Sequence, residues 1–246
     1  MTELAIIGGS GFTNLEELEI VRREVIHTPF GEPSAPLTHG IFNGLNVVFL
    51  PRHGTAHTIP PHKVNYRANM WALRHVGIER IIGIAAVGSI RGAMVPGAIV
   101  IPDQIIDYTY GRHNTFFEND LTHVTHIDFT NPYDEMLRLA LYNAAETAGI
   151  EVIAGGTYGA TQGPRLETSA EINRMERDGC DLVGMTGMPE TALSRELEMG
   201  YACCAVVANW GAGRGTGPIT MEEIDLHLSA GMEKTRKLLS TLSGIL

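Results

Sequence analysis

The residues best suited to chemistry lie where apolar segments of the chain end. The first apolar segment runs into the glycine turn 8–12, whose backbone N–H groups and Ser10 hydroxyl are suited to holding an anion. Arg52 and His53 directly follow the apolar run 46–50. A guanidinium offers a planar fork of donors to phosphate oxygens, and an imidazole adds another. The two motifs together predict an anion site, although an Arg-His pair is also common on ordinary surfaces.

Three further polar groups occupy similar positions. Glu167 immediately precedes a segment with helix-start signals, Thr186 follows the apolar run 181–184, and Asn209 follows the run 201–208. In α/β folds the carboxyl ends of strands build the ligand pocket. We therefore expect these side chains to share one pocket with Ser10 and Arg52.

The elements that must position these groups alternate along the chain. Continuous apolar, β-branched runs predict buried strands at Leu4–Ile7, Asn46–Leu50, Arg80–Ala86, Ala98–Ile101, Glu151–Ala154, Asp181–Gly184 and Tyr201–Ala208. Helical patterns occupy Val64–His75, Tyr133–Ala148, Thr168–Asp178, Pro189–Met199 and Thr220–Leu242. This alternation predicts a single α/β domain over residues 1–246, with a mostly parallel or mixed central sheet flanked by helices on both faces.

Local signals define several boundaries. Thr168 with Glu171, and Thr220 with Glu223, have the spacing of a capping box, and Pro189 suits a first helical position. The glycine-rich segment 209–218 breaks the rhythm, and it is either a lid over a ligand or a plain connection.

Charge and motif content exclude several function classes. The chain has 18 Lys and Arg against 28 Asp and Glu, a formal charge of −10 that argues against nucleic-acid partners. Its apolar runs are too short for a signal peptide or a membrane span, and its three cysteines form no CxxC pair, so we expect a soluble, cytoplasmic protein. The dinucleotide motif fails at Asn14, and the ten histidines lack zinc spacing, so neither a nicotinamide cofactor nor a metal is expected.

Read together, the motifs resemble those of the trimeric purine nucleoside phosphorylase and methylthioadenosine phosphorylase family. The similar segments occur in order along nearly the whole chain: Ile6-Ile7-Gly8-Gly9-Ser10-Gly11, Arg52-His53-Gly54, His62-Lys63-Val64-Asn65-Tyr66-Arg67-Ala68-Asn69, Val87-Gly88-Ser89, Gly163-Pro164-Arg165 and Met185-Thr186-Gly187-Met188-Pro189-Glu190. The resemblance implies a homotrimer that uses inorganic phosphate as a co-substrate to cleave a glycosidic bond, without metal or organic cofactor.

The resemblance also implies roles for individual residues. The phosphate ligands would be Ser10, Arg52, His53, the backbone of Ala86 and Thr186. Met185 would lie against the ribose, Met221 near its 5′ position, and His126 in the pocket of a neighbouring subunit. Arg52→Ala is then expected chiefly to weaken phosphate use.

The base and the 5′ end decide the substrate. Asn209 can donate to a 6-oxo group and accept from a protonated nitrogen 7, and Glu167 can accept from the N–H at nitrogen 1. These two, with Arg52 and His53, are the predicted catalytic residues. Met221 offers a thioether suited to a 5′-methylthio group, although its helical spacing equally suits core packing.

This combination predicts a phosphorylase of 5′-methylthio purine nucleosides that favours methylthioinosine and does not exclude methylthioadenosine. A general phosphorylase of inosine and guanosine, or a non-catalytic nucleoside-binding protein, are the alternatives.

Overall fold

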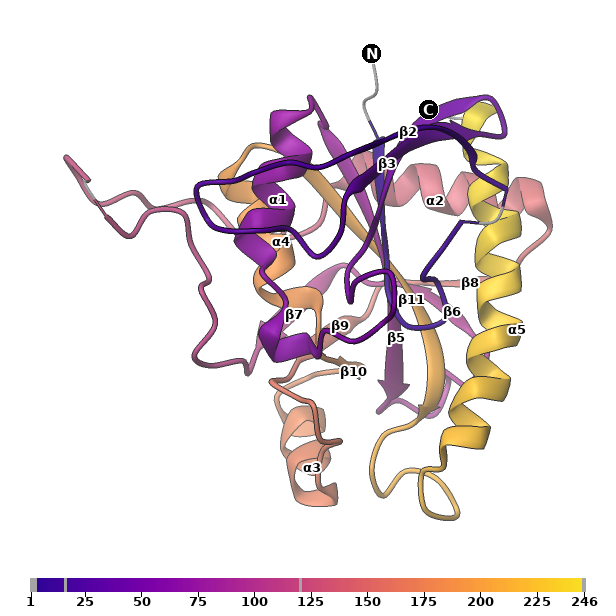
Figure 1. Ribbon diagram of the computed structural model, residues 1–246. Coiled ribbons are helices and arrows are strands. Elements are labelled where there is room, and N and C mark those ends of the chain that lie inside the picture. The colour runs from indigo at the N-terminus through magenta and orange to yellow at the C-terminus, as the bar shows by residue number, and fades with distance from the viewer. Residues whose placement is uncertain (1–3, 16, 120, 245–246) are drawn as a thin grey trace.

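The computed structural model describes residues 4–15, 17–119 and 121–244, in which strands and helices alternate (Figure 1). The strands are β1 (Leu4–Gly8), β2 (Glu19–Glu24), β3 (Leu37–Phe42), β4 (Leu45–Pro51), β5 (Arg80–Ser89), β6 (Ile99–Ile101), β7 (Gln104–Asp107), β8 (Val152–Ala154), β9 (Thr157–Ala160), β10 (Leu182–Gly184) and β11 (Gly200–Trp210). The helices are α1 (Tyr66–His75), α2 (Glu135–Ala148), α3 (Ser169–Arg177), α4 (Gly187–Glu196) and α5 (Met221–Ser240), with short 3-10 helices η1 (Pro61–Lys63) and η2 (Leu242–Gly244).

The strands form one mixed sheet. Its main path runs β2-β3-β4-β1-β5-β10-β9-β7, while β11 pairs with β5 and β6, and β6 pairs with β8. The pairs β1–β4, β1–β5 and β5–β11 are parallel, so the carboxyl ends of these strands point the same way. β10 runs antiparallel to β5, with Val183 opposite Gly88, so the residues after β10 return toward the middle of β5. The residues that follow β1, β4 and β11 therefore lie at one edge of the sheet, and the residues after β10 turn back toward them.

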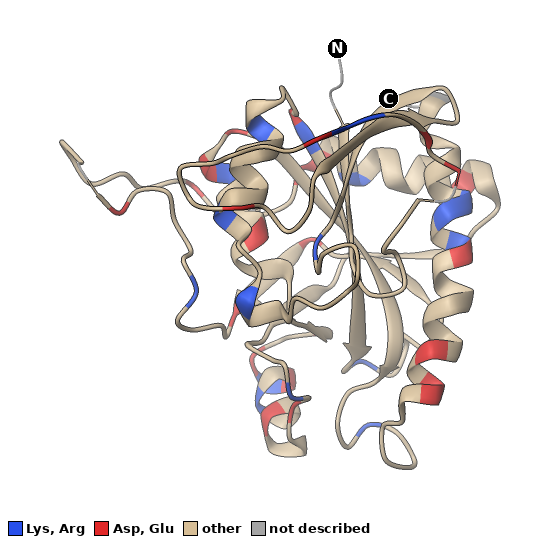
Figure 2. Ribbon diagram, viewed as in Figure 1, with Lys and Arg blue, Asp and Glu red and all other residues tan. Residues whose placement is uncertain are grey.

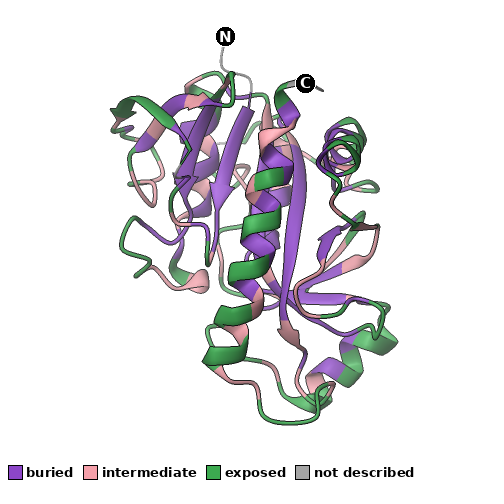
Figure 3. Cartoon of the chain, turned by 90° about the vertical axis from the view of Figure 1, so that its right-hand side faces the viewer, coloured by how far each residue is buried: buried purple, intermediate pink, exposed green. Residues whose placement is uncertain are grey.

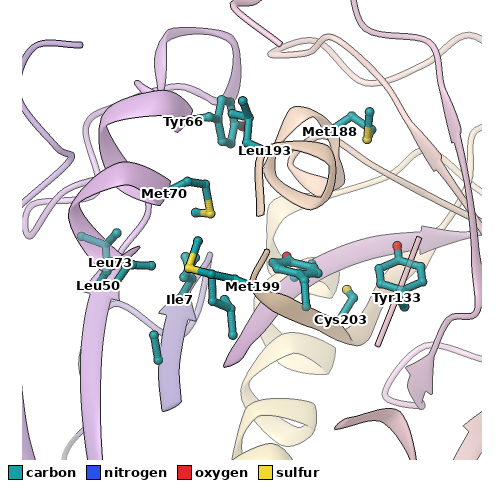
Figure 4. Close-up of a cluster of buried hydrophobic side chains, with 14 of the residues drawn as sticks. Ile7, Leu50, Tyr66, Met70, Leu73, Tyr133, Met188, Leu193, Met199 and Cys203 are labelled. Atoms are coloured by element: carbon teal, nitrogen blue, oxygen red, sulfur yellow. The ribbon is translucent and has the colours of Figure 1, made fainter. Parts of the chain in front are cut away.

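Helices cover both faces of the sheet, as the sequence predicts (Figure 1). α1 and α4 pack together on one face, where Met70 and Leu193 belong to a buried cluster (Figure 4). α2 and α5 pack on the other face, over a second cluster that includes Leu239. The adjacent Cys203 and Cys204 fall into the first and second cluster respectively, as the alternation of a strand requires. Figure 3 shows α5 with buried residues toward the sheet and exposed residues outward.

Most of the helix starts predicted from the sequence are confirmed. Thr168 and Glu171 form a complete capping box at α3. At α5, only half of the predicted box is present: the Thr220 side chain accepts from the Glu223 backbone N–H at 3.3 Å. α4 is kinked one residue before Pro189, so its regular part begins where the proline predicts. Acidic residues lie in the first turn of α5 and a lysine in its last, which suits the helix dipole (Figure 2).

All seven predicted strands are present, but four others were not predicted. β2 is a charged edge strand, exposed along nearly its whole length, and within the described part of the chain it pairs with β3 alone. β7 and β9 have four residues each, too few for a clear apolar pattern. The segment predicted to leave the sheet at 209 also stays in it two residues longer, because β11 runs through Trp210. Among the described residues, no helix is long and apolar enough to cross a membrane.

Candidate active site

A cavity of about 710 Å³ opens at the carboxyl edge of the sheet, between the strand ends and α5. Nine of the ten predicted site residues line it: Ser10, Arg52, His53, Ala86, Glu167, Met185, Thr186, Asn209 and Met221. The tenth, His126, is exposed in the segment between β7 and α2 and lies outside this cavity. The structure therefore brings the strand-end motifs together as predicted.

Arg52 is the cation at the floor of the cavity, and it is paired with Glu190 of α4. Its Nε and Nη2 donate to the two carboxylate oxygens of Glu190 at 2.7 and 2.6 Å, and both side chains are almost completely buried. The Tyr201 hydroxyl also donates to Glu190, at 2.7 Å. Burial alone would lower the pKa of Arg52, but Glu190 outweighs that effect and raises it above its usual value. Arg52 is therefore a fixed, permanently charged group.

The pairing leaves part of the guanidinium available to a ligand. Nη1 donates to the carbonyl of Ile84 at 2.9 Å, so three of the five N–H bonds of Arg52 have partners and two remain. Gly9 packs directly against this group: a Cβ there would lie 2.9 Å from Arg52 Nη1 and 2.7 Å from the Ile84 oxygen. Because glycine has no side chain, the backbone turn at Gly9 can lie close enough to the Arg52 guanidinium for both to contact one small anion.

His53 is held in one neutral form beside Arg52. Its Nδ1 lies 2.8 Å from the carbonyl of Ile59, which accepts the Nδ1–H and leaves Nε2 with its lone pair. Burial, and after it the positive charge of Arg52, lower the pKa of His53 to about 4. The ring of His57 lies tilted against that of His53, with centroids 4.8 Å apart, and its Nε2 lies 3.3 Å from Ser10 Oγ. His57 therefore joins the two motifs that flank the predicted anion position.

The depressed pKa of His53 predicts an acid-dependent loss of stability. Between pH 6.5 and 4 the unfolded chain binds a proton at His53 and the folded chain does not, so stability falls as the pH drops through this window, by up to about 3 kcal/mol. Urea unfolding at pH 7, 5.5 and 4 measures the effect. His53→Gln should lose less stability on acidification than the parent. Equal losses in the two proteins would contradict the depressed pKa.

The base side of the cavity holds Glu167 and Asn209. The Thr161 hydroxyl donates to Glu167 Oε1 at 2.7 Å. Asn209 lies opposite Gly88 after a register shift in β11, and its Nδ2 donates to the carbonyl of Trp210 at 2.7 Å. This contact uses one of the two N–H bonds of the Asn209 amide and leaves the other, with Oδ1, for a ligand. The Glu167 carboxylate, an acceptor, and the Asn209 amide, which is both donor and acceptor, thus line the same cavity.

The α5 side of the cavity carries a group of apolar side chains, beside which Asp225, Ser229 and Arg236 also line the cavity. Met221 begins α5 and is 64% exposed, so its interpretation as a core residue is wrong. It lines the cavity together with Met185 and with Ile224 and Leu228 of α5. Thioether and aliphatic groups of this kind suit a small apolar substituent and offer no hydrogen bond to a hydroxyl.

Comparisons with known proteins agree with the chemistry of this cavity. Residues 3–243 match the model of the phosphorylase superfamily. The chain belongs to this superfamily. It is 53% identical to a protein of Pseudomonas syringae named "probable S-methyl-5'-thioinosine phosphorylase", over 98% of both chains. It is also 47% identical to the "6-oxopurine nucleoside phosphorylase" of Pyrococcus furiosus, over 91% of this chain and 85% of that one.

The structural match is as extensive. Methylthioadenosine phosphorylase from Schistosoma mansoni, in complex with adenine, superposes with a TM-score of 0.95 at 32% identity, covering all of this chain and 92% of the other. The fold of this phosphorylase is therefore the nucleoside phosphorylase fold that the resemblance implied.

Sequence reasoning missed four residues of this phosphorylase that shape the cavity: Glu190, His57, Thr161 and Arg112. Glu190 ends the segment 185–190 that resembles the family, yet its role depends on Arg52, 138 residues away. His57 lies four residues after His53 without any motif to mark it, and the described residues contain no group of three or more His, Cys, Asp or Glu arranged to hold a metal ion. Thr161 follows a strand that was not predicted, and Arg112 lies in a segment without periodicity.

Proposed function

We propose that this phosphorylase cleaves S-methyl-5′-thioinosine with inorganic phosphate, releasing hypoxanthine and 5-methylthioribose 1-phosphate. The observation that carries the proposal is the composition of one cavity. An anion site at Arg52 lies at its floor, Glu167 and Asn209 form its polar wall, and Met221 belongs to the apolar group on its α5 side. The relatives named as methylthioinosine and 6-oxopurine phosphorylases support both halves of this assignment.

In the proposed reaction, a phosphate oxygen attacks carbon 1 of the ribose while the bond to nitrogen 9 of the base breaks. The free N–H bonds of Arg52, the Ser10 hydroxyl, the Ala86 backbone and Thr186 hold the phosphate in line with that bond. His53 presents the lone pair of Nε2, so it accepts from a protonated phosphate oxygen. Because Glu190 already pairs with Arg52, the phosphate keeps its negative charge available to the cationic sugar.

The base leaves with the electrons of the broken bond. Negative charge spreads over its imidazole ring and is neutralised by a proton at nitrogen 7, which solvent delivers and which balances the proton that the hydrogen phosphate gives up as it becomes the sugar phosphate ester. Asn209 accepts from that N–H through Oδ1 and donates to the 6-oxo group through its remaining N–H, while Glu167 accepts from nitrogen 1. All of these groups act as donors or acceptors, so the proposal includes no metal and no organic cofactor.

A side-by-side assay tests the proposal. Purine release from methylthioinosine, methylthioadenosine and inosine should require phosphate and should be most efficient with methylthioinosine, because only this nucleoside combines an N–H at nitrogen 1 with an apolar 5′ group. Activity should survive a chelator. Equal efficiency with inosine would favour a general 6-oxopurine phosphorylase, the second candidate that the Pyrococcus relative supports.

We also propose that the protein is a cytoplasmic homotrimer in which His126 completes the pocket of a neighbouring subunit. The segment between β7 and α2 extends away from the rest of the chain (Figure 1), and it exposes Tyr110 and Val124, each 73% exposed. An arm of this shape, with apolar side chains at the surface, suits contact with a second copy. The three cysteines are free and buried, which suits a reducing compartment.

His126→Ala tests this arrangement. The variant should remain trimeric in sedimentation experiments but show a KM for the nucleoside about tenfold higher, the loss of one hydrogen bond to the substrate. His123→Ala is the matched control, because His123 is also exposed and lies in the same segment. An unchanged KM in His126→Ala, or full activity in a monomeric preparation, would refute the shared pocket.

A further inference from the structure

Thr161 is a buried residue that no motif singled out, and it contacts Glu167 from behind the cavity that Glu167 lines. It directly follows β9, is 7% exposed, and its backbone N–H donates to the carbonyl of Gly184 at 2.7 Å. Its hydroxyl has two acceptors within reach, Glu167 Oε1 at 2.7 Å and the Gly184 carbonyl at 3.2 Å. A threonine hydroxyl donates only one proton, and the shorter contact makes Glu167 the main acceptor.

This contact fixes which oxygen of Glu167 remains for a ligand. Glu167 lies on the loop between β9 and α3 and is only half-buried, so its side chain would otherwise sample several rotamers. With Oε1 accepting from Thr161, Oε2 is the oxygen left to accept from a base in the cavity. The hydroxyl therefore both orients the carboxylate and leaves it as an acceptor.

The backbone beneath Thr161 is itself held by Arg112. Arg112 Nη2 donates to the carbonyls of Thr161 and Gln162 at 3.1 and 2.8 Å, and its Nη1 donates to the carbonyls of Met185 and Met188 at 2.9 and 2.5 Å. One guanidinium thus fixes the start of the Glu167 loop relative to the loop that carries Met185. Thr161 is the member of this network whose side chain reaches the base-reading carboxylate.

We propose that Thr161 is a positioning residue that selects, through Glu167, purines with an N–H at nitrogen 1. The proposal rests on the proposed function, in which Glu167 contacts nitrogen 1. A 6-oxopurine offers an N–H to the free carboxylate oxygen, whereas a 6-aminopurine offers a lone pair there. Two acceptors facing each other are unfavourable, so a carboxylate held in this orientation discriminates against adenine.

Thr161→Val removes the hydroxyl and keeps the shape of the side chain. The value of kcat/KM for methylthioinosine should fall roughly tenfold, as expected when a hydrogen bond to a charged group is lost, while that for methylthioadenosine should not fall. Thr161→Ser restores the hydroxyl and should restore the ratio of the two efficiencies. Thr147→Val, whose hydroxyl bonds only the Asn143 carbonyl on α2, is the matched control and should change neither value.

The substrate ratio separates positioning from general damage. If kcat/KM in Thr161→Val falls equally for both nucleosides, or for neither, the proposal is overturned. In a Glu167→Ala background, Thr161→Val should leave the ratio of the two kcat/KM values unchanged. A change of that ratio in this background would also overturn the proposal. The parent enzyme tests the proposed function independently: a parent that prefers methylthioadenosine refutes that function, while the shift between parent and Thr161→Val still decides the role of Thr161.

Discussion

Replacing Arg52 by alanine is expected to destabilise the protein as well as weaken its use of phosphate. The substitution leaves the carboxylate of Glu190 completely buried with only the Tyr201 hydroxyl as a side-chain donor. Breaking a buried ion pair by removing one partner costs about 3–5 kcal/mol, because the other charge is left without compensation. The sequence alone predicted only the effect on phosphate, because it did not reveal the pairing.

The catalytic effect has a separate origin. Loss of a charge-assisted contact to phosphate costs about 1.5–3 kcal/mol, which corresponds to a KM for phosphate roughly 10- to 100-fold higher. Urea unfolding measures the first effect, and phosphate titration at saturating nucleoside measures the second.

A double substitution separates the two effects. Arg52→Met with Glu190→Leu removes both charges and should regain most of the lost stability while phosphate use stays poor. Unchanged stability in Arg52→Ala would contradict the structural role of the pair, and an unchanged KM for phosphate would place Arg52 outside the anion site.

The sequence predicted this architecture well where one local property decides the outcome. Burial on both faces produces long apolar strands such as β5 and β11, and the residue after such a strand is easily recognised. That is why Ser10, Arg52 and Thr186 could be assigned to one pocket before their positions were known. The alternation of strand and helix was sufficient to predict a shared edge for Ser10 and Arg52, whereas Thr186 lies near them because β10 runs antiparallel to β5.

What the sequence did not reveal are partners brought together by distant elements. Glu190 meets Arg52 because α4, after its kink, packs against α1 and β11, and no periodicity encodes that encounter. Thr161 follows β9, whose four residues stay in the sheet because their neighbours β7 and β10 pair with them. Tertiary context, and not local propensity, determines such strands.

The double variant Asn209→Asp with Glu167→Ser should shift preference from methylthioinosine toward methylthioadenosine. An aspartate at 209 accepts from a 6-amino group and, when protonated, donates to nitrogen 7, and a serine at 167 can donate to the lone pair of nitrogen 1. An unpaired buried polar group costs about 1–3 kcal/mol, so exchanging both contacts should change the ratio of efficiencies by roughly two orders of magnitude.

The surroundings of the two residues determine how complete that switch is. Thr161 loses its partner at 167 but can turn to the Gly184 carbonyl at 3.2 Å, so Glu167→Ser leaves no orphaned hydroxyl. Asn209 is less free, because its Nδ2 donates to the Trp210 carbonyl at 2.7 Å. An aspartate there must rotate away from that oxygen or share a proton with it, which competes with donation to nitrogen 7. Glu167→Ser alone should therefore produce the larger part of the shift.

The measurement is kcat/KM for both nucleosides in the parent, the two single variants and the double variant. A ratio that does not move toward methylthioadenosine in the double variant would show that Asn209 and Glu167 do not read the base.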